Sequence, residues 1–261
     1  MLRALWSAAS GMEAQQMNID NISNNLANVN TTAYKKSKIE FQDLMYQTTR
    51  AAGSSTAAGG QIPTGTQFGH GSRVTATAKL FSQGSMQQTG VALDVAIEGE
   101  GFFEILQSDG TSAFTRDGAF KLNSTGKIVT SDGLPVKGLD AVPAGTTQIT
   151  IGSDGNFSIV LAGVLTKKAP VTLARFPNSS GLRSAGRNLY VETDSSGKAE
   201  TGGVPGQNGY GTLAQGFLEL SNVETVQEMV NLIVAQRAYE INSKAIQAAD
   251  EMLGQANNLR R

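Results

Sequence analysis

The chain has no cysteine among its 261 residues. Disulfide bonds, thiol catalysis and thiolate metal sites are therefore excluded. Histidine is nearly absent as well, because His70 is the single one in the sequence. A histidine-based metal cluster or a Ser-His-Asp triad therefore cannot form within one chain.

Charge and long apolar runs are also scarce. Charged residues make up 16% of the chain and the net charge is -1, so neither nucleic acid nor an acidic membrane surface is indicated as a partner. The longest apolar runs, such as 232–235, are far too short to span a bilayer, and we expect no membrane-spanning segment. Ser7, Ser10 and Glu13 interrupt the N-terminal stretch, which does not match a cleavable secretory signal. We therefore expect the protein to stay in the cytoplasm or to leave by a route that keeps its N-terminus.

Both ends of the chain carry apolar residues at intervals of seven, a pattern typical of a helix that packs along another helix. We expect helices over 1–29 and 221–259, paired antiparallel, the second capped by Ser221 or Asn222 with Glu224 in its first turn. The predicted packing positions are Leu5, Met12, Ile19, Ile22, Leu26 and Val29 in the first helix, and Leu232, Ala235, Tyr239, Asn242, Ile246, Ala249, Leu253 and Ala256 in the second.

The polar positions of the first helix are unusual. Before Lys35 only Arg3, Glu13 and Asp20 are charged, and most other polar positions are amides or small hydroxyls. A helix that faces water normally uses Glu and Lys, whereas Asn and Ser are weaker helix formers. The segment is either a poor surface helix or, as we prefer, a helix contacted on most sides by other subunits.

Asn242 is a polar residue within the apolar stripe of the second helix. It is either a tolerated polar site or a residue that fixes the register of the helix pair, as a buried Asn does in coiled coils. Tyr239, in the same stripe, is interpreted as a packing residue rather than a catalytic one.

The region between the helices divides by composition. From 46 to 72 it is rich in Ala, Gly, Ser and Thr, which indicates either a flexible linker or a segment that becomes ordered between subunits. From 73 to 211 short apolar or β-branched runs alternate with turn residues, including four Asp-Gly steps. Asp-Gly favours type I′ hairpin turns, so we expect a β-rich domain with its own core.

Four segments of this sequence resemble the same family of proteins. They are 23–37 (SNNLANVNTTAYKKS), 94–103 (DVAIEGEGFF), 113–120 (AFTRDGAF) and 236–245 (QRAYEINSKA). In order and along essentially the whole chain, they resemble the rod and hook proteins of the bacterial flagellum. The signature positions are Asn24, Asn25, Leu26, Ala27, Asn28, Gln236, Arg237, Ala238, Tyr239 and Glu240.

The chain departs from this family at one turn. The family usually has Gly and then an aromatic Phe where this sequence has Ala33 and Tyr34. Alanine lacks the freedom of glycine to adopt a positive φ.

The resemblance implies an α+β fold, with the long terminal helices paired as a coiled-coil-like core domain and with a β-rich middle domain. The expected divisions are 1–45 for the N-terminal part of the core, 46–72 for a rod-specific insert, 73–211 for the outer domain and 212–261 for the C-terminal part of the core. The insert resembles the distal-rod members of the family, in which such a segment is thought to stiffen the rod.

By the same resemblance the chain is a structural, non-enzymatic subunit of the basal-body rod, which crosses the periplasm and outer-membrane region. No catalytic, cofactor-binding or metal-ligating residue is implied. The expected partners are copies of itself in a helical tube, other rod proteins, the hook protein, the surrounding ring proteins and the flagellar type III export apparatus. Such a tube would transmit torque from motor to hook and let exported subunits pass.

Three alternatives remain open from the sequence. A proximal rod or hook paralogue would share the signatures at both ends. A secreted adhesin-like protein would also have a β domain but needs a cleavable signal. A wall-cleaving enzyme would need an acid/base pair such as Glu98 and Glu100, which share a strand face.

Overall fold

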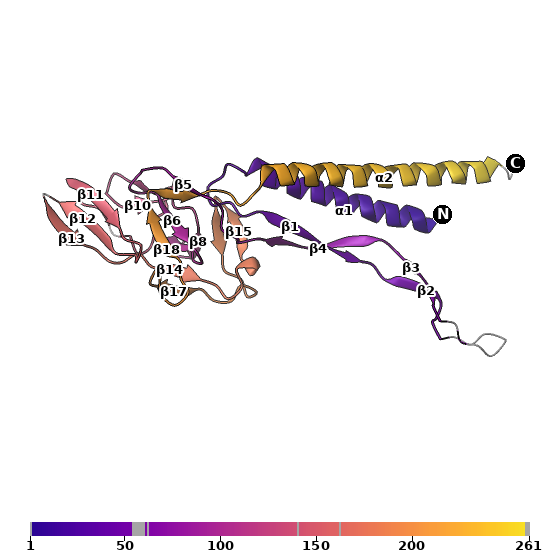
Figure 1. Cartoon of the computed structure of the whole chain (residues 1–261), viewed down its shortest axis with the longest axis horizontal. Helices are drawn as coiled ribbons and strands as arrows, with labels where there is room; N and C mark the ends of the chain where they lie inside the picture. The colour runs from indigo at the N-terminus through magenta and orange to yellow at the C-terminus, as the bar shows by residue number, and fades with distance from the viewer. Residues whose placement is uncertain (1, 54–60, 62, 140, 162, 259–261) are drawn as a thin grey trace. The chain divides into compact units, whose positions relative to one another are not determined.

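The computed structural model describes residues 2–53, 61, 63–139, 141–161 and 163–258 (Figure 1). A long helix lies near each end of the chain, α1 over Leu2–Ala27 and α2 over Thr225–Asn258, and strands occupy the sequence between them. The expected α+β class, with terminal helices and a strand-rich middle, is therefore confirmed. Within the described ranges, no helix combines the length and apolar character that crossing a membrane requires.

The chain folds into two compact units. The first contains residues 1–26, 37–78 and 225–261, and the second contains 27–36 and 79–224. The backbone therefore passes between the units four times, after residues 26, 36, 78 and 224.

Among its described residues, the first unit contains both helices and four strands. β1 (Ser37–Asp43) pairs with β4 (Ser72–Lys79), whose last residue already belongs to the second unit. β2 (Tyr46–Arg50) pairs antiparallel with β3 (Thr66–Gly69). The segment expected as an insert, 46–72, thus begins in a two-stranded ribbon, and its residues 54–60 and 62 lie outside the described residues.

The two helices contact each other within this unit. A Cβ added to Gly11 would lie 3.0 Å from Nδ2 of Asn242. Near the other end of α1, Asn25 Nδ2 donates a hydrogen bond of 3.4 Å to Oε2 of Glu228. Because Gly11 lies near Asn242, while the later Asn25 of α1 lies near the earlier Glu228 of α2, the helices run in opposite directions.

The predicted start of the second helix is wrong by a few residues. The helix begins at Thr225, so neither Ser221 nor Asn222 is its cap. The side chain of Asn222 instead bridges two loops. It accepts a hydrogen bond from the Lys36 N–H at 2.8 Å and donates one to the Leu80 carbonyl at 2.8 Å.

The second unit contains all the remaining strands. They are β5 (Met86–Gln88), β6 (Val95–Glu98), β7 (Phe103–Leu106), β8 (Ser112–Thr115), β9 (Lys121–Leu122), β10 (Ile128–Val129), β11 (Thr146–Ile151), β12 (Phe157–Leu161), β13 (Val164–Lys167), β14 (Leu173–Arg175), β15 (Arg183–Gly186), β16 (Leu189–Val191), β17 (Glu200–Gly203), β18 (Thr212–Gln215) and β19 (Phe217–Glu219). The larger sheets have the orders β15-β16-β8-β7 and β11-β12-β13, and β14-β17, β18-β6, β19-β5 and β10-β9 are two-stranded.

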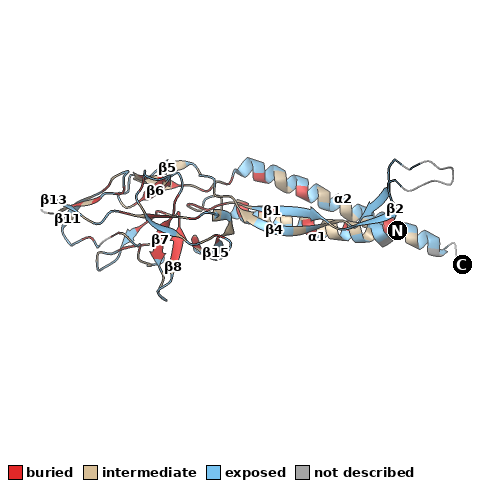
Figure 2. Cartoon of the chain, turned by 90° about the horizontal axis from the view of Figure 1, so that it is seen from below, coloured by how far each residue is buried: buried red, intermediate tan, exposed pale blue. Residues whose placement is uncertain are grey.

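The core of this unit lies around β6, β7 and β8, which Figure 2 shows among the buried strands. A second, aromatic cluster contains Phe102, Phe114, Phe176 and Tyr190. Phe114 and Phe176 meet edge to face with their ring centres 4.8 Å apart. Such T-shaped pairs add about 0.5–1.5 kcal/mol beyond the burial of their area. The unit therefore has a hydrophobic interior of its own.

Three of the four Asp-Gly steps have positive φ at the glycine alone, so they do not form the expected turn type. Gly110, Gly133 and Gly155 have φ of 82°, 82° and 83°, whereas the aspartates before them do not have positive φ. A type I′ turn needs positive φ at both central residues. That geometry occurs between β15 and β16, where Arg187 and Asn188 have φ of 55° and 58°. Sequence alone missed this turn because Arg is a poor signal for it.

Ala33 occupies the left-handed region although it is not glycine, with φ of 54°. Its methyl group is buried, and its N–H donates a hydrogen bond of 2.8 Å to the Glu219 carbonyl. Left-handed backbone costs an L-residue about 1–2 kcal/mol, so the surrounding structure holds this turn in place. The turn geometry that a glycine would give is therefore kept with alanine.

We expect Gly118→Ala to destabilise the second unit by about 1–3 kcal/mol. A Cβ at residue 118 would overlap the carbonyl oxygen of Val95, and backbone has to move to relieve the overlap. Gly254→Ala is the matched control, because a Cβ there meets nothing within 4 Å and alanine favours the helix by up to about 1 kcal/mol. Denaturant unfolding measures both; equal effects would contradict the close approach at Gly118.

Candidate assembly surface and its internal support

The predicted packing positions of the terminal helices lie at different depths. Ile22, Ala235 and Ala249 are buried, and Tyr239 and Ala256 are exposed. Half-buried positions are Leu5, Met12, Ile19, Leu26, Val29, Leu232, Asn242, Ile246 and Leu253. Most of the predicted positions are thus partly covered within the chain, and three are buried.

Sequence analysis missed Glu228, which is 4% exposed in the first turn of α2. It lies seven residues before Ala235, so it belongs to the series that continues through Asn242 and Ala249. Glu228 accepts the hydrogen bond from Asn25 described above. A charged residue gives no hydrophobic signal, so only the interval of seven could have indicated its place.

Among the signature residues, Asn25 has the clearest structural task. Its Oδ1 accepts a hydrogen bond from the Ser37 N–H at 2.9 Å, and its Nδ2 donates to the Ser37 carbonyl at 2.9 Å. Asn21 Nδ2 donates to the same carbonyl at 2.8 Å. The amides of α1 therefore fix the start of β1 against the helix. Asn24, Ala27, Gln236, Arg237 and Glu240 are exposed, and Asn28 and Ala238 are half-buried.

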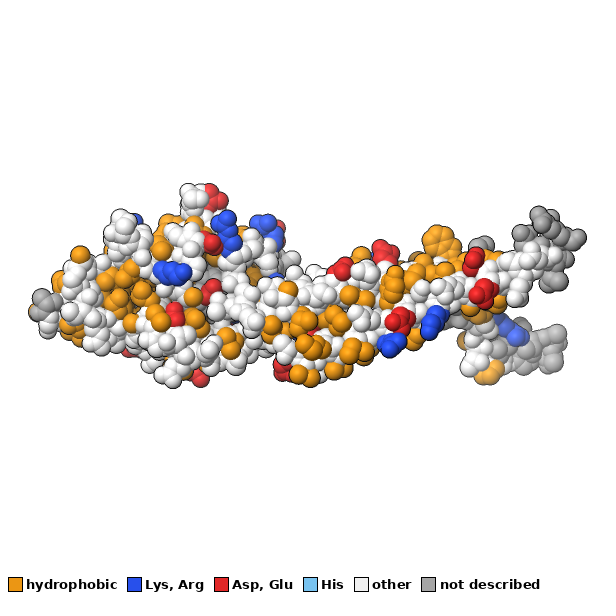
Figure 3. All heavy atoms as spheres, turned by 90° about the horizontal axis from the view of Figure 1, so that it is seen from above, with side chains coloured by type: hydrophobic (Ala, Val, Ile, Leu, Met, Phe, Trp, Pro, Cys, Tyr) orange, Lys and Arg blue, Asp and Glu red, His pale blue; other side chains and the backbone are white. Residues whose placement is uncertain are grey.

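A second apolar stripe runs along the outer face of α2, opposite the buried series. We call it the outer stripe. It consists of Val226, Met229, Val230, Ile233, Val234 and Ile241, whose exposed fractions lie between 47% and 75%. Figure 3 shows hydrophobic side chains on the surface of the helical unit. Contiguous exposed apolar surface marks interaction sites, so this stripe is the candidate assembly surface.

The second unit is held by a buried ion cluster around Glu219, the last residue of β19. Its Oε1 lies 2.6 Å from Lys35 Nζ, and its Oε2 lies 2.9 Å from Arg116 Nε. The Gly84 N–H donates a further hydrogen bond of 2.9 Å to Oε1. The three charged side chains are at most 4% exposed. The carboxylate therefore joins three segments that are far apart in the sequence.

The two cations of this cluster also bind backbone carbonyls. Lys35 Nζ donates to the Ser82 carbonyl at 2.7 Å, and Arg116 Nη2 donates to the Gly99 carbonyl at 2.9 Å. Weaker bonds of 3.3 Å join the Arg116 guanidinium to the carbonyls of Ile97 and Gly101. Burying charge without such partners is strongly unfavourable. Each charged group here therefore has an oppositely charged partner and further hydrogen bonds.

Burial and the neighbouring charges both shift the pKa values of Glu219 and Lys35. Burial by itself raises the pKa of Glu219, but Arg116 and Lys35, with the Gly84 N–H, outweigh it and hold that pKa below its ordinary value of 4.5. Burial, together with the nearby charge of Arg116, lowers the pKa of Lys35 despite its pairing with Glu219.

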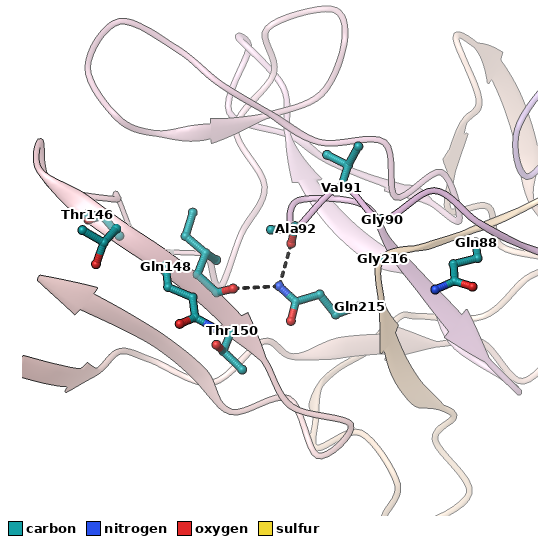
Figure 4. A pocket seen from close by; sticks show the side chains of 11 residues that line it. Gln88, Gly90, Val91, Ala92, Thr146, Gln148, Thr150, Gln215 and Gly216 are labelled. Atoms are coloured by element: carbon teal, nitrogen blue, oxygen red, sulfur yellow. Dashed lines mark hydrogen bonds between the residues drawn. The ribbon is translucent and has the colours of Figure 1, made fainter. Parts of the chain in front are cut away.

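A cavity of about 570 Å³ lies beside β11 in the second unit (Figure 4). Gln215 spans it, donating from Nε2 to the carbonyls of Ala92 and Ile149 at 2.7 and 3.0 Å. None of the residues described along its wall is charged. Glu98 and Glu100 are exposed and do not line it. The cavity therefore offers no acid/base pair to the wall-cleaving alternative.

The chain matches three family profiles in order. They are the flagellar basal body rod protein family at residues 5–35, the flagellar hook protein FlgE/F/G D1 domain at 96–159, and the flagellar basal body rod FlgEFG protein C-terminal family at 214–259. The matched segments thus cover α2, most of α1 and part of the strand-rich unit. The fold and these matches define a protein of the flagellar rod and hook class.

Proteins that are similar over the full length of the chain show which family within this class it belongs to. The flagellar basal-body rod protein FlgG of Borreliella burgdorferi is 52% identical over 100% of both chains. The proteins of the same name from Caulobacter vibrioides and Bacillus subtilis are 45% and 42% identical, over 99% and 100% of this chain and 100% of each relative. The chain belongs to the FlgG family of basal-body rod proteins. It is a structural subunit of the rod and is located in the basal body.

We expect Glu219→Gln to lower the free energy of opening in the second unit by about 3–5 kcal/mol. The substitution leaves two buried cations without their counter-ion. Hydrogen exchange of the β7 and β8 amides measures the effect. Glu240→Gln is the control, because its pair with Arg237 is exposed and worth at most about 1 kcal/mol. Equal losses in the two variants would contradict a structural role for the cluster.

The cluster also predicts a pH dependence. Because the folded-state pKa of Glu219 is below 4.5, the ionised carboxylate stabilises the fold above that pH, and the stabilisation is lost as the pH falls through the folded pKa. Thermal unfolding of the full chain from about pH 7 to about pH 2 should show this acid-side loss. In Glu219→Gln the slope of stability against pH should be smaller; an unchanged slope would assign it to other carboxylates.

Proposed function

We propose that the chain assembles with copies of itself into the distal rod, a helical tube that transmits torque from motor to hook and lets exported subunits pass. The observation that carries the proposal is the outer stripe of α2. It stays exposed after α1 has contacted the opposite face of the helix. A heterologous, head-to-tail contact between copies generates an open helical array.

In this proposal α1 and α2 form a coiled-coil-like pair, with the predicted packing positions in its seam. Ala235 and Ala249 allow close approach, and the contact of Asn242 with Gly11 supports a role in register. Neighbouring copies then cover the outer stripe. One α2 thus contributes one face to its own chain and the other face to the assembly.

The free energies of burial and association favour contacts among many copies over an isolated dimer. Fully burying one Val, Ile or Met side chain is worth about 1.5–3 kcal/mol, and the side chains of the outer stripe are already partly covered. Association costs roughly 4–15 kcal/mol in lost freedom of motion. One stripe therefore gives a weak pairwise contact, and contacts to several neighbours make a stiff tube.

The remaining partners follow from membership of the family. We propose contacts with other rod proteins, the hook protein and the surrounding ring proteins, and delivery by the flagellar type III export apparatus. Residues 1–45 and 212–261 would form the core of the tube, 73–211 its outer part, and 46–72 a stiffening insert. The exposed side chains of Tyr46 and Phe68 support contacts by the ribbon of that insert.

We expect Ile233→Asp to prevent assembly without unfolding the chain. Ile233 is 56% exposed, so the carboxylate is hydrated in the monomer but would be buried in the assembly. Gln247→Asp, exposed on the same helix beyond the outer stripe, is the control. Circular dichroism checks folding, and sedimentation with electron microscopy measures polymer. Polymers of Ile233→Asp as abundant as those of the control would reject the outer stripe as the assembly surface.

A further inference from the structure

The chain has one tryptophan, Trp6, and it is 73% exposed on α1. Tryptophan is among the residues that most often dominate the binding energy of protein interfaces, where it fills a pocket on the partner. An exposed, single tryptophan on a helix of an assembling protein is therefore a candidate anchor. The question is which surface has a matching pocket.

A cavity of about 220 Å³ lies between α1 and β4 in the first unit. Its wall consists of Ser10, Glu13, Ala14, Met17, Ser72, Arg73 and Val74. It is smaller than the roughly 300–1,000 Å³ of pockets that hold small molecules. Its size therefore suits one large side chain better than a metabolite.

Glycine makes this cavity possible. Gly71 has φ of 107°, and a Cβ there would overlap Oγ of Ser10. Only a residue without a side chain lets the start of β4 come so close to α1. The cavity lies directly beyond this close approach, at Ser72 and Arg73.

The wall has the chemistry that an indole needs. Met17 presents a thioether, which makes favourable contacts with aromatic rings, and Ala14 and Val74 add apolar surface. Arg73 can place its guanidinium on the ring face. The carboxylate of Glu13 can accept a hydrogen bond from the indole N–H, which needs a partner when it is buried.

Trp6 cannot fill the cavity of its own chain. Trp6, Ser10, Glu13 and Met17 lie at helical intervals along one face of α1, with Trp6 at the N-terminal end. Side chains on a helix point toward its N-terminus, so the indole points away from a cavity that lies in the C-terminal direction. A second copy has to supply the ring.

We propose that Trp6 of one copy inserts into the cavity between α1 and β4 of the next copy. The contact is heterologous, because ring and cavity are different surfaces, and it therefore propagates. The proposal rests on the self-assembly proposed above and adds a specific anchor to it. It also explains why a large aromatic side chain faces solvent in the isolated chain.

Fluorescence tests this contact directly, because Trp6 is the sole tryptophan. On assembly of the unchanged protein, its emission should shift to shorter wavelength and iodide quenching should fall severalfold. A nitroxide is then attached to a chain carrying Trp6→Phe and Gln42→Cys, with no other cysteine to react. Gln42 accepts a hydrogen bond from Arg73 and so marks the rim of the cavity.

Co-assembly of this labelled chain with unchanged chains should quench the tryptophan of the unchanged chains, since only they contain Trp6. The same label on Gln247→Cys, also with Trp6→Phe, should quench far less. Equal quenching by the two labels, or a Trp6 that remains open to iodide in the polymer, would overturn the proposal while self-assembly stands. If the unchanged protein does not polymerise, the proposed function fails first and the inference fails with it.

Variants give an independent measure. Trp6→Ala and the cavity-filling Ser72→Tyr should each raise the concentration needed for assembly by roughly tenfold or more, and the double variant should be no worse than either alone. Trp6→Phe should restore part of the loss, and Gln16→Ala, exposed on α1 outside the cavity, should have no effect. Additive losses in the double variant would show that the two sites do not meet.

Discussion

The carboxylate of Glu219 is the interaction on which the second unit depends. It forms ion pairs with both Lys35 and Arg116, and it accepts a further hydrogen bond from a backbone N–H. Lys35 lies just after α1, Arg116 follows β8, and Glu219 comes shortly before α2. The two ends of the strand-rich unit are therefore tied to its middle by charge. Removing one member of such a buried group lowers the free energy of unfolding by several kcal/mol. That is a large part of the stability of a typical domain.

The two faces of α2 differ in what they contact. The inner face follows intervals of seven through Glu228, Ala235, Asn242 and Ala249, and it meets α1. The outer face carries the apolar stripe from Val226 to Ile241. A helix that is apolar on both sides is typical of burial on both sides. The low charge content of the chain, 16%, agrees with the proposed assembly.

Sequence reasoning found the helices because intervals of seven depend only on local spacing. It found the strand-rich middle from turn residues, for which local backbone preferences suffice. It did not find the ion cluster, because nothing local connects Lys35, Arg116 and Glu219. It placed α2 too early because Asn222 reads as a helix cap, whereas its amide serves two loops. It also concentrated on the inner stripe of α2 and overlooked the outer one, since the inner stripe is the more regular.

The four passages of the backbone between the two units have a mechanical consequence. A load applied to one unit reaches the other through four covalent segments in parallel, after residues 26, 36, 78 and 224. Each segment therefore carries only part of the tension, and a single break in the main chain leaves three connections. Four covalent connections in place of one agree with the proposed role in transmitting torque.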